Sequence, residues 1–233
     1  MRVENSSKFE EKIKYQFHNK ALLKQALTHS SYANEQKINK VKDYERIEFL
    51  GDAVLELVSS EFLYILYPTM VEGEMTKLRS SYVCETALAY CARQMQLSNY
   101  IYLGKGEENT GGRDRDSILS DVCEAIIGAI YLDGGFAAAK KHIQNFILND
   151  LEDKNLFFDS KTLLQEIIQS EGNESLHYVC VKEEGPDHDK KFYIEARIFD
   201  ETVIGTGIGK TKKAAEQQAA YHAIKSKKSK IEE

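Results

Sequence analysis

The sequence predicts two domains, an all-helical N-terminal domain and a small α+β C-terminal domain with the element order αβββα. From Phe9 to about Leu151 the apolar residues recur at helical spacing. Between 176 and 209, apolar and polar residues instead alternate, or β-branched and aromatic residues are enriched, as is typical of strands. The 233 residues are enough for two domains that each bury a core. We expect an N-terminal domain over 1–153, a linker over 154–159 and a second domain over 160–229.

Proline and glycine mark the ends of the first long helices. One helix is predicted to begin near Tyr44 and to end at Pro68. Residues 72–73 are expected to form the turn before another helix, which runs from about Glu74 to Leu97.

The rest of the N-terminal domain contains a glycine-rich segment and two more helices. Segment 104–115 has four glycines and mixed charges, which predicts a mobile surface loop. The helix after it is apolar around most of its circumference, which predicts a central position. Gly134 and Gly135 are expected to end it, before a last helix from Phe136 to about Asp150.

The C-terminal domain shows a different pattern. A short amphipathic helix is predicted over 163–170, and strands are predicted over 176–182, 191–199 and 202–209. An alanine-rich helix over 211–228 ends the order αβββα.

The charge is unevenly distributed along the chain. The formal net charge of −6 would argue against a nucleic-acid partner, because attraction to phosphates needs Lys and Arg. Residues 205–230, however, contain seven lysines and one acid, Glu216. This asymmetry is typical of a basic binding module attached to an acidic body.

Other features of the composition indicate a cytoplasmic protein. The start of the chain lacks the apolar core of a secretion signal, and we expect no membrane-spanning run of about 20 apolar residues. The four cysteines lie far apart without a Cys-x-x-Cys pair, which favours reduced, packed thiols over disulfides or a zinc site.

Three acids interrupt the helix that contains YERIEFLGDAVLEL. Glu45, Glu48 and Asp52 fall within an arc of about 60° on one side of that helix. An acidic strip opposite an apolar one is usually a solvated face, and this reading suits Glu45 in particular.

The same reading suits the acids of the central helix less well. Asp121 and Glu124 lie at i and i+3 on a helix that is apolar nearly all round. Gly128 continues their face without a side chain, so that another helix could pack closely there.

If the two strips face each other, several carboxylates converge. A like-charge pair at 4 Å costs about 4 kcal/mol at an effective dielectric near 20, so protons or cations must neutralise some of them. Oxygen-only ligands favour Mg²⁺ or Mn²⁺ over zinc, and such an ion can stabilise charge that develops on a phosphate.

The motifs YERIEFLGDAVLEL, VEGEMTKLRS and SILSDVCEAIIGAIYLDGG, in this order and at suitable distances, resemble ribonuclease III, a family of double-stranded-RNA endonucleases. The resemblance covers nearly the whole chain, and ERIEFLGDA is highly specific to the family. Tyr44 and Ile47 depart from it, because the family often has Asn and Leu at these positions.

The resemblance implies a catalytic site for phosphodiester hydrolysis that leaves 5′-phosphate and 3′-hydroxyl ends. It assigns the divalent metal, Mg²⁺ with Mn²⁺ as a substitute, to four carboxylates. These are Glu48, Asp52, Asp121 and Glu124. Asp52 and Glu124 are also implied to be catalytic, with Glu124 the most critical, and Glu45 and Glu72 match acidic positions nearer the cut strand.

The resemblance also implies a homodimer. Each site cuts one strand, so staggered cuts in a duplex need two sites related by symmetry. In the family, the aromatic residue of ERIEFLGD docks in a socket of the partner, a role that falls to Phe49. From spacing alone, Phe49 could equally be an ordinary core residue.

The C-terminal domain resembles the double-stranded-RNA-binding domain, through LLQEIIQ, GPDHDKKF and GIGKTKKAAEQQAA. A protein recognises A-form RNA mainly by the shape of the duplex, because side chains cannot enter its deep, narrow major groove. By position, Gln165 and Glu166 match contacts with one minor groove, and His188 with the next. Lys210, Lys212 and Lys213 match phosphate contacts at a helix N-terminus. For Lys225 to Lys230 we favour a solvated C-terminal end.

Three function classes follow from these features. The leading one is an active double-stranded-RNA endonuclease that processes ribosomal precursors and structured messages. The alternative is a protein that binds RNA without cleavage, although all six acidic positions are present. A hydrolase of small phosphate substrates would leave the basic tail unexplained. We expect the remaining histidines to be surface or capping residues; they are His18, His29, His142, His177 and His222.

Overall fold

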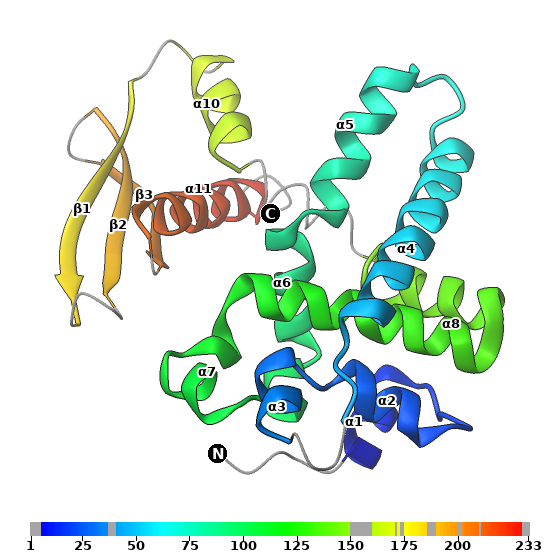
Figure 1. The fold of residues 1–233 in the computed structure, drawn as a ribbon. Helices are drawn as coiled ribbons and strands as arrows, with labels where there is room; N and C mark the ends of the chain where they lie inside the picture. Colours follow the sequence, from blue (N-terminus) through cyan, green and yellow to red (C-terminus); the bar gives the residue numbers. More distant parts are fainter. Residues whose placement is uncertain are drawn as a thin grey trace. The chain divides into compact units, whose positions relative to one another are not determined.

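A computed structural model describes residues 6–36, 41–149, 160–170, 172, 175–185, 190–199, 202–209 and 211–229. The chain forms two compact units, Met1–Asn149 and Asp150–Glu233. The first unit is helical and the second combines a three-stranded sheet with two helices, as the sequence predicts. Figure 1 shows the elements of both units.

The first unit is built around α4 and α8, which pack extensively against each other. Its α-helices are α1 (Ser6–Ile13), α2 (Lys20–Ala26), α3 (Ser30–Glu35), α4 (Glu45–Leu66), α5 (Glu72–Val83), α6 (Glu85–Gln94), α7 (Lys105–Asn109) and α8 (Asp116–Phe146). Two short 3-10 helices, η1 (Leu97–Tyr100) and η2 (Gly112–Asp114), lie between them. In Figure 1 the later turns of α4 and the start of α5 project together beyond the other helices of this unit.

The region after Pro68 differs from the prediction of one long helix. Glu72 and Gly73 already belong to the first turn of α5, and the backbone at Cys84 is extended, with φ −69° and ψ 160°. Cys84 ends α5 and begins α6, and its carbonyl accepts from the backbone N–H of Leu88. The periodicity could not reveal this break, because the residues on both sides keep helical spacing.

The glycine-rich segment 104–115 is also more structured than predicted. It forms α7 and η2, and the buried side chain of Arg113 ties it to the domain. The Arg113 guanidinium donates to the carbonyl of Ile101 at 3.0 Å and to the carboxylate of Glu108 at 2.9 Å. A buried arginine with several acceptors orders the loop, which the surface composition did not indicate.

α8 is interrupted as the sequence predicts. Gly135 has φ 77° and ψ −178°, which is not helical, so a second helical segment runs from there to Phe146. By length and composition α8 could cross a membrane, contrary to the expectation that no segment would. Half of its most apolar window is buried inside the unit, and it carries Asp121 and Glu124, so we interpret α8 as the core helix of this unit.

One histidine contradicts the sequence-based interpretation. His142 is 3% exposed, and neither ring nitrogen has a hydrogen-bond partner among the described residues. Burial lowers its pKa to about 4, which keeps the ring neutral. His29, by contrast, is the expected capping residue, since it accepts from Ser31 N at the start of α3.

The second unit has the order α10 (Ser160–Ser170), β1 (Leu176–Glu184), β2 (Lys191–Ile198), β3 (Thr202–Gly209) and α11 (Lys212–Ser229). The strands form an antiparallel sheet in the order β1-β2-β3. A Cβ on Gly205 or Gly207 would lie within 2.3 Å of the α11 backbone, so β3 packs directly against that helix. The alanines of α11, including Ala215 and Ala219, complete this close contact in the core.

Candidate active site

The candidate site lies where α4 and α8 cross with their backbones in contact. A Cβ on Gly51 would lie 1.9 Å from the carbonyl oxygen of Glu124, and one on Gly128 would lie 2.3 Å from that of Ile47. Neither position has room for a side chain. The prediction that Gly128 lets another helix pack closely is confirmed, and the crossing brings the acids of the two helices side by side.

The acids of the two helices differ in exposure. Glu45 and Asp52 are exposed on α4, whereas Glu48, Asp121 and Glu124 are half-buried. A solvated position therefore fits Glu45 and Asp52, whereas Glu48, Asp121 and Glu124 are partly shielded from solvent.

These carboxylates are close enough to perturb one another. Burial, followed by the charges of Asp52, Glu48 and Asp121, raises the pKa of Glu124 to about 8. Burial also raises the pKa of Glu48, to which the charges of Asp121, Glu45 and Asp52 add. The pKa of Asp121 is raised mainly by burial. Negative charge thus converges on this crossing from both helices.

The donor chemistry of the cluster fits a hard divalent cation. All four residues implied as ligands offer carboxylate oxygens, and a cation would relieve the repulsion that helps to raise the pKa values of Glu124 and Glu48. As the side chains stand, no group of three or more His, Cys, Asp or Glu among the described residues is arranged so that it could hold a metal ion. The structure therefore brings the four carboxylates together without setting their final ligand geometry.

Two further residues of this cluster were not singled out from the sequence. Glu56 contributes to the raised pKa of Glu124, and it follows Asp52 by one helical turn, a spacing that could have identified it. Tyr44, noted only as a departure from the family, donates its hydroxyl proton to Asp121 Oδ2 at 3.3 Å. The two residues are 77 positions apart, so no local pattern could reveal this bond.

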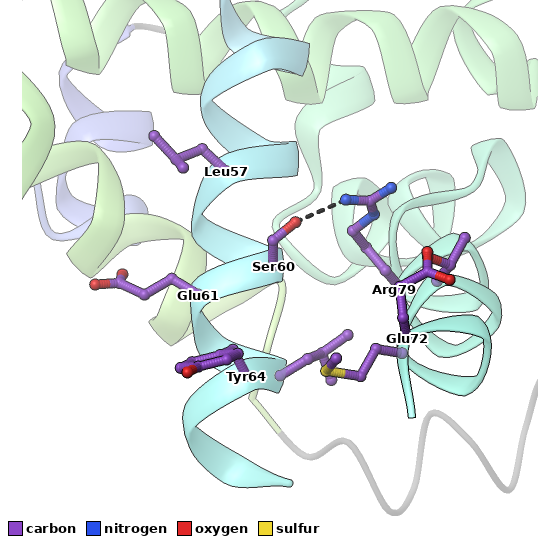
Figure 2. A pocket seen from close by; sticks show the side chains of 9 residues that line it. Leu57, Ser60, Glu61, Tyr64, Glu72 and Arg79 are labelled. Carbon is purple, nitrogen blue, oxygen red and sulfur yellow. Dashed lines mark hydrogen bonds between the residues drawn. The ribbon is translucent and has the colours of Figure 1, made fainter. Parts of the chain in front are cut away.

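Glu72 lies away from this cluster within the same chain. It is exposed in the first turn of α5, where it accepts from Thr76 Oγ1 at 2.9 Å. It lines a pocket of about 430 Å³ between α4 and α5, shown in Figure 2, and does not contribute to the raised pKa values of Glu48, Asp121 or Glu124.

The pocket between α4 and α5 has an apolar floor and a polar edge. Leu57, Leu63 and Met75 supply apolar surface. Arg79 donates to Ser60 Oγ at 2.7 Å, the dashed line in Figure 2, and forms an ion pair with Glu56. This network joins α5 to α4 along one side of the pocket.

Phe49 is a surface residue of α4. Its side chain is 78% exposed, so the interpretation as an ordinary core residue is wrong for the isolated chain. Leu57 and Tyr64, 58% and 73% exposed, follow Phe49 by 8 and 15 residues, so the three side chains fall within an arc of about 80° on α4. Such an apolar stripe marks a contact surface.

The RNA-binding residues predicted from the sequence lie on both helices of the second unit. Gln165 and Glu166 are on α10, half-buried and exposed respectively, while Lys212 and Lys213 are exposed in the first turn of α11. His188 and Lys210 lie outside the described residues.

The first turn of α11 also makes contacts with the sheet. Lys212 Nζ lies 3.0 Å from Glu183 Oε1 and above the ring of Phe192. The hydroxyl of Thr211 accepts from Ala214 N at 3.1 Å and caps the helix. Lys212 is therefore held by an acid of β1 that the sequence analysis did not consider.

Comparison with known proteins identifies both units. The family model described as "Ribonuclease-III-like" matches residues 19–151, and "Double-stranded RNA binding motif" matches residues 160–227. A curated "Ribonuclease 3" of Enterococcus faecalis is 50% identical over 213 residues, which cover 90% of this chain and 92% of the relative. A "Ribonuclease 3" of Bacillus licheniformis is 45% identical over 225 residues, 96% of this chain and 90% of the relative.

A solved structure supports the fold of the first unit. The nuclease domain of the Campylobacter jejuni ribonuclease III is 43% identical, with a TM-score of 0.58, and the match covers 61% of this chain and 96% of that one. That structure is described as showing flexibility in a region involved in dimer formation. With both of its units and nearly all of its length accounted for by these relatives, this chain belongs to the ribonuclease III family.

Proposed function

We propose that this endoribonuclease cleaves double-stranded RNA with the carboxylates at the crossing of α4 and α8, while the second unit holds the duplex. The observation that carries the proposal is the convergence of negative charge on Glu124 from Asp52, Glu48 and Asp121. A cluster that raises a carboxyl pKa to about 8 favours a cation, and a phosphodiester substrate supplies the negative charge that such a cation attracts.

Glu48, Asp52, Asp121 and Glu124 would hold Mg²⁺, with Mn²⁺ as a substitute. When bound, the ion supplies Lewis-acid stabilisation of charge on the scissile phosphate and activates water. The protein's part is positional. The close contact at Gly51 and Gly128 fixes the two rows of acids relative to each other. Glu124, whose pKa is raised to about 8, must lose its proton to act as a ligand.

The apolar stripe of α4 and the pocket beside it suggest how two copies assemble. Ser60 lies near the middle of the residues of α4 that line the pocket. Phe49 precedes Ser60 by 11 residues, which is a distance of about 16 Å along the helix axis. In a two-fold pair with antiparallel α4 helices, Phe49 of each copy would meet the pocket of the other. We propose a homodimer with Phe49 seated between the partner's α4 and α5.

This pairing would also give Glu72 a catalytic role. Phe49 lies between Glu48 and Asp52 along α4, and Glu72 lines the pocket that would receive Phe49. Each site would then be completed by the partner's Glu72, while Glu45 lies at the exposed end of the acidic row. Two such sites would cut the two strands of a duplex, giving staggered ends with 5′-phosphates and 3′-hydroxyls.

The second unit would bind RNA by shape. Gln165 and Glu166 would meet one minor groove, His188 the next, and Lys210, Lys212 and Lys213 the phosphates between them. We further propose that the protein acts in the cytoplasm on ribosomal precursors and structured messages.

The test is cleavage of a long RNA duplex by the purified protein. We expect cutting with Mg²⁺, none with a chelator, and binding without cutting by Glu124→Gln. Mapping of the ends at nucleotide resolution should show paired, staggered cuts. If Glu124→Gln cuts at the wild-type rate, the metal site is misassigned, and if the wild type binds but never cuts, the protein is an RNA-binding relative without nuclease activity.

A further inference from the structure

Tyr44 is placed at the junction of three segments around the candidate metal site. Its backbone N–H donates to the carbonyl of Thr28 at 2.9 Å, and its own carbonyl accepts from Glu48 N at 2.9 Å as α4 begins. The side chain is 3% exposed, and its ring lies 5.7 Å from the ring of His29. The ring therefore has little freedom to turn away.

The hydroxyl of Tyr44 ends at the edge of the carboxylate cluster. It lies 3.3 Å from Asp121 Oδ2, and the Asp121 carboxylate accepts no other hydrogen bond within the described residues. An ionised carboxylate only accepts hydrogen bonds, so the Tyr44 hydroxyl is the donor of this pair.

A hydrogen-bond donor to one oxygen of a metal-binding carboxylate helps to orient that carboxylate. The donor restricts rotation of the carboxylate and occupies Oδ2, so that the other oxygen, Oδ1, points in a different direction. Asp121 is half-buried, and a buried carboxylate is costly unless it is hydrogen-bonded, which the Tyr44 hydroxyl provides at one of its oxygens.

We propose that Tyr44 is a positioning residue for the metal site, whose hydroxyl orients Asp121 so that this carboxylate is ready to bind the divalent ion. The inference rests on the proposed function, since it requires Asp121 to be a metal ligand. The inference also makes Tyr44 a connection between the two rows of acids. Its backbone carbonyl accepts a hydrogen bond from Glu48 N on α4, and its side chain donates one to Asp121 on α8.

The test measures Mn²⁺ binding to the metal-free full-length protein, by the electron paramagnetic resonance signal of free Mn²⁺. Tyr44→Phe removes only the hydroxyl and should weaken Mn²⁺ binding by about tenfold, the lower end for loss of a partner to a ligand. In cleavage assays the Mg²⁺ concentration for half-maximal rate should rise, while the rate at saturating Mg²⁺ changes little.

The matched control is Tyr15→Phe. Tyr15 also donates to an aspartate of α8, Asp133, at 2.8 Å, but this pair lies outside the carboxylate cluster. Its loss should lower the melting temperature and leave Mn²⁺ affinity unchanged. A Tyr44→Phe variant that behaves like this control, with wild-type Mn²⁺ affinity, overturns the proposal.

Asp121→Asn separates this proposal from the function on which it rests. If Asp121→Asn weakens Mn²⁺ binding and Tyr44→Phe does not, only the positioning role is lost. If Asp121→Asn binds Mn²⁺ like the wild type, the metal site itself is misassigned and both proposals fail. The double variant should bind no more weakly than Asp121→Asn alone, and additive losses would show that Tyr44 does not act through Asp121.

Discussion

Glu124 is the residue on which the electrostatics of the crossing concentrate. Burial and four neighbouring carboxylates raise its pKa to about 8, from an ordinary value of 4.5. Between these two pH values the folded protein retains a proton that the unfolded chain has released. The contribution to stability is therefore largest at low pH and is lost as the pH rises.

The metal-free protein should accordingly become less stable as the pH rises from about 4.5 to about 8. Calorimetric melting in the presence of a chelator measures this dependence. Glu124→Gln should flatten the slope, because the variant has no proton to lose at this position. An equal slope in the variant would assign the dependence to other groups, such as Glu48, whose pKa is also raised.

Cation binding should release protons near neutral pH, because Glu124 must ionise to become a ligand. Isothermal titration calorimetry in buffers of different ionisation enthalpy counts the protons released with Mg²⁺. We expect the number to approach one or more at pH 7 in the wild type and to be smaller in Glu124→Gln. Release that is unchanged by the substitution would contradict the assignment.

At the residue scale, the sequence predicted the acids but not their partners. Helical spacing was enough to place Glu48 and Asp52 on one face and to mark Asp121 and Glu124 as unusual for a core helix. The hydrogen bond from Tyr44 joins distant segments, and the burial of the His142 ring, whose nitrogens have no hydrogen-bond partner among the described residues, is set by tertiary packing. No spacing rule contains either feature.

At the element scale, the close approach of α4 and α8 decides whether the acids meet. The carbonyl oxygen of Glu124 occupies the space that a Cβ on Gly51 would need. The atoms that an added Cβ would meet belong to the backbone of α8, so the clash cannot be relieved by a change of rotamer.

Gly51→Ala should force the helices apart and lower the free energy of unfolding by about 1–3 kcal/mol, as overpacking does. Cleavage should fall further than stability alone explains, because the acidic rows separate. The matched control is Gly73→Ala in the first turn of α5, where an added Cβ meets nothing within 4 Å. Chemical denaturation and cleavage assays on both variants test this, and equal stability of the two would refute the crossing as a constraint.

The start of α11 carries the lysines proposed to bind phosphates. Lys212→Ala with Lys213→Ala should weaken duplex binding and reduce the slope of log affinity against log salt by about one per lost contact. The paired control is Lys225→Ala with Lys227→Ala, which removes the same charge from the later turns of α11. Titrations at several salt concentrations distinguish the pairs, and identical losses would indicate general attraction only.

Glycine and proline marked some element boundaries correctly but not all, since Gly73 was expected in a turn and lies in the first turn of α5. Pro68 and Gly135 were correctly interpreted, whereas the break at Cys84 carries no such residue and was missed. The helices inside 104–115 were missed for the opposite reason, since four glycines favoured a loop that Arg113 in fact holds in place.

At the scale of the whole molecule, the proposed dimer places the exposed stripe of α4 against a second copy of the chain. Phe49→Ala should shift the protein from dimer to monomer in sedimentation equilibrium, because the substitution removes the side chain proposed to fill the partner's pocket. Double-strand cleavage should fall together with the dimer fraction. Phe199→Ala, which removes another exposed phenylalanine, from the second unit, should leave both unchanged.

A dimer that persists in Phe49→Ala at low protein concentration would place the interface elsewhere. The sequence indicated this interface only through the family resemblance, because spacing alone fitted a core residue equally well. The division into two units, in contrast, followed directly from the change of periodicity and charge along the chain.

The glycine contact between α4 and α8 also bears on protein engineering. Grafting the four acids onto another helical scaffold would fail unless the recipient helices approached each other as closely as α4 and α8 do. On helices held apart by larger side chains, the carboxylates would not meet at the same place. A successful transplant would carry Gly51 and Gly128 with the acids, and the smallest residues of the motif would then be as indispensable to the new enzyme as the charged ones.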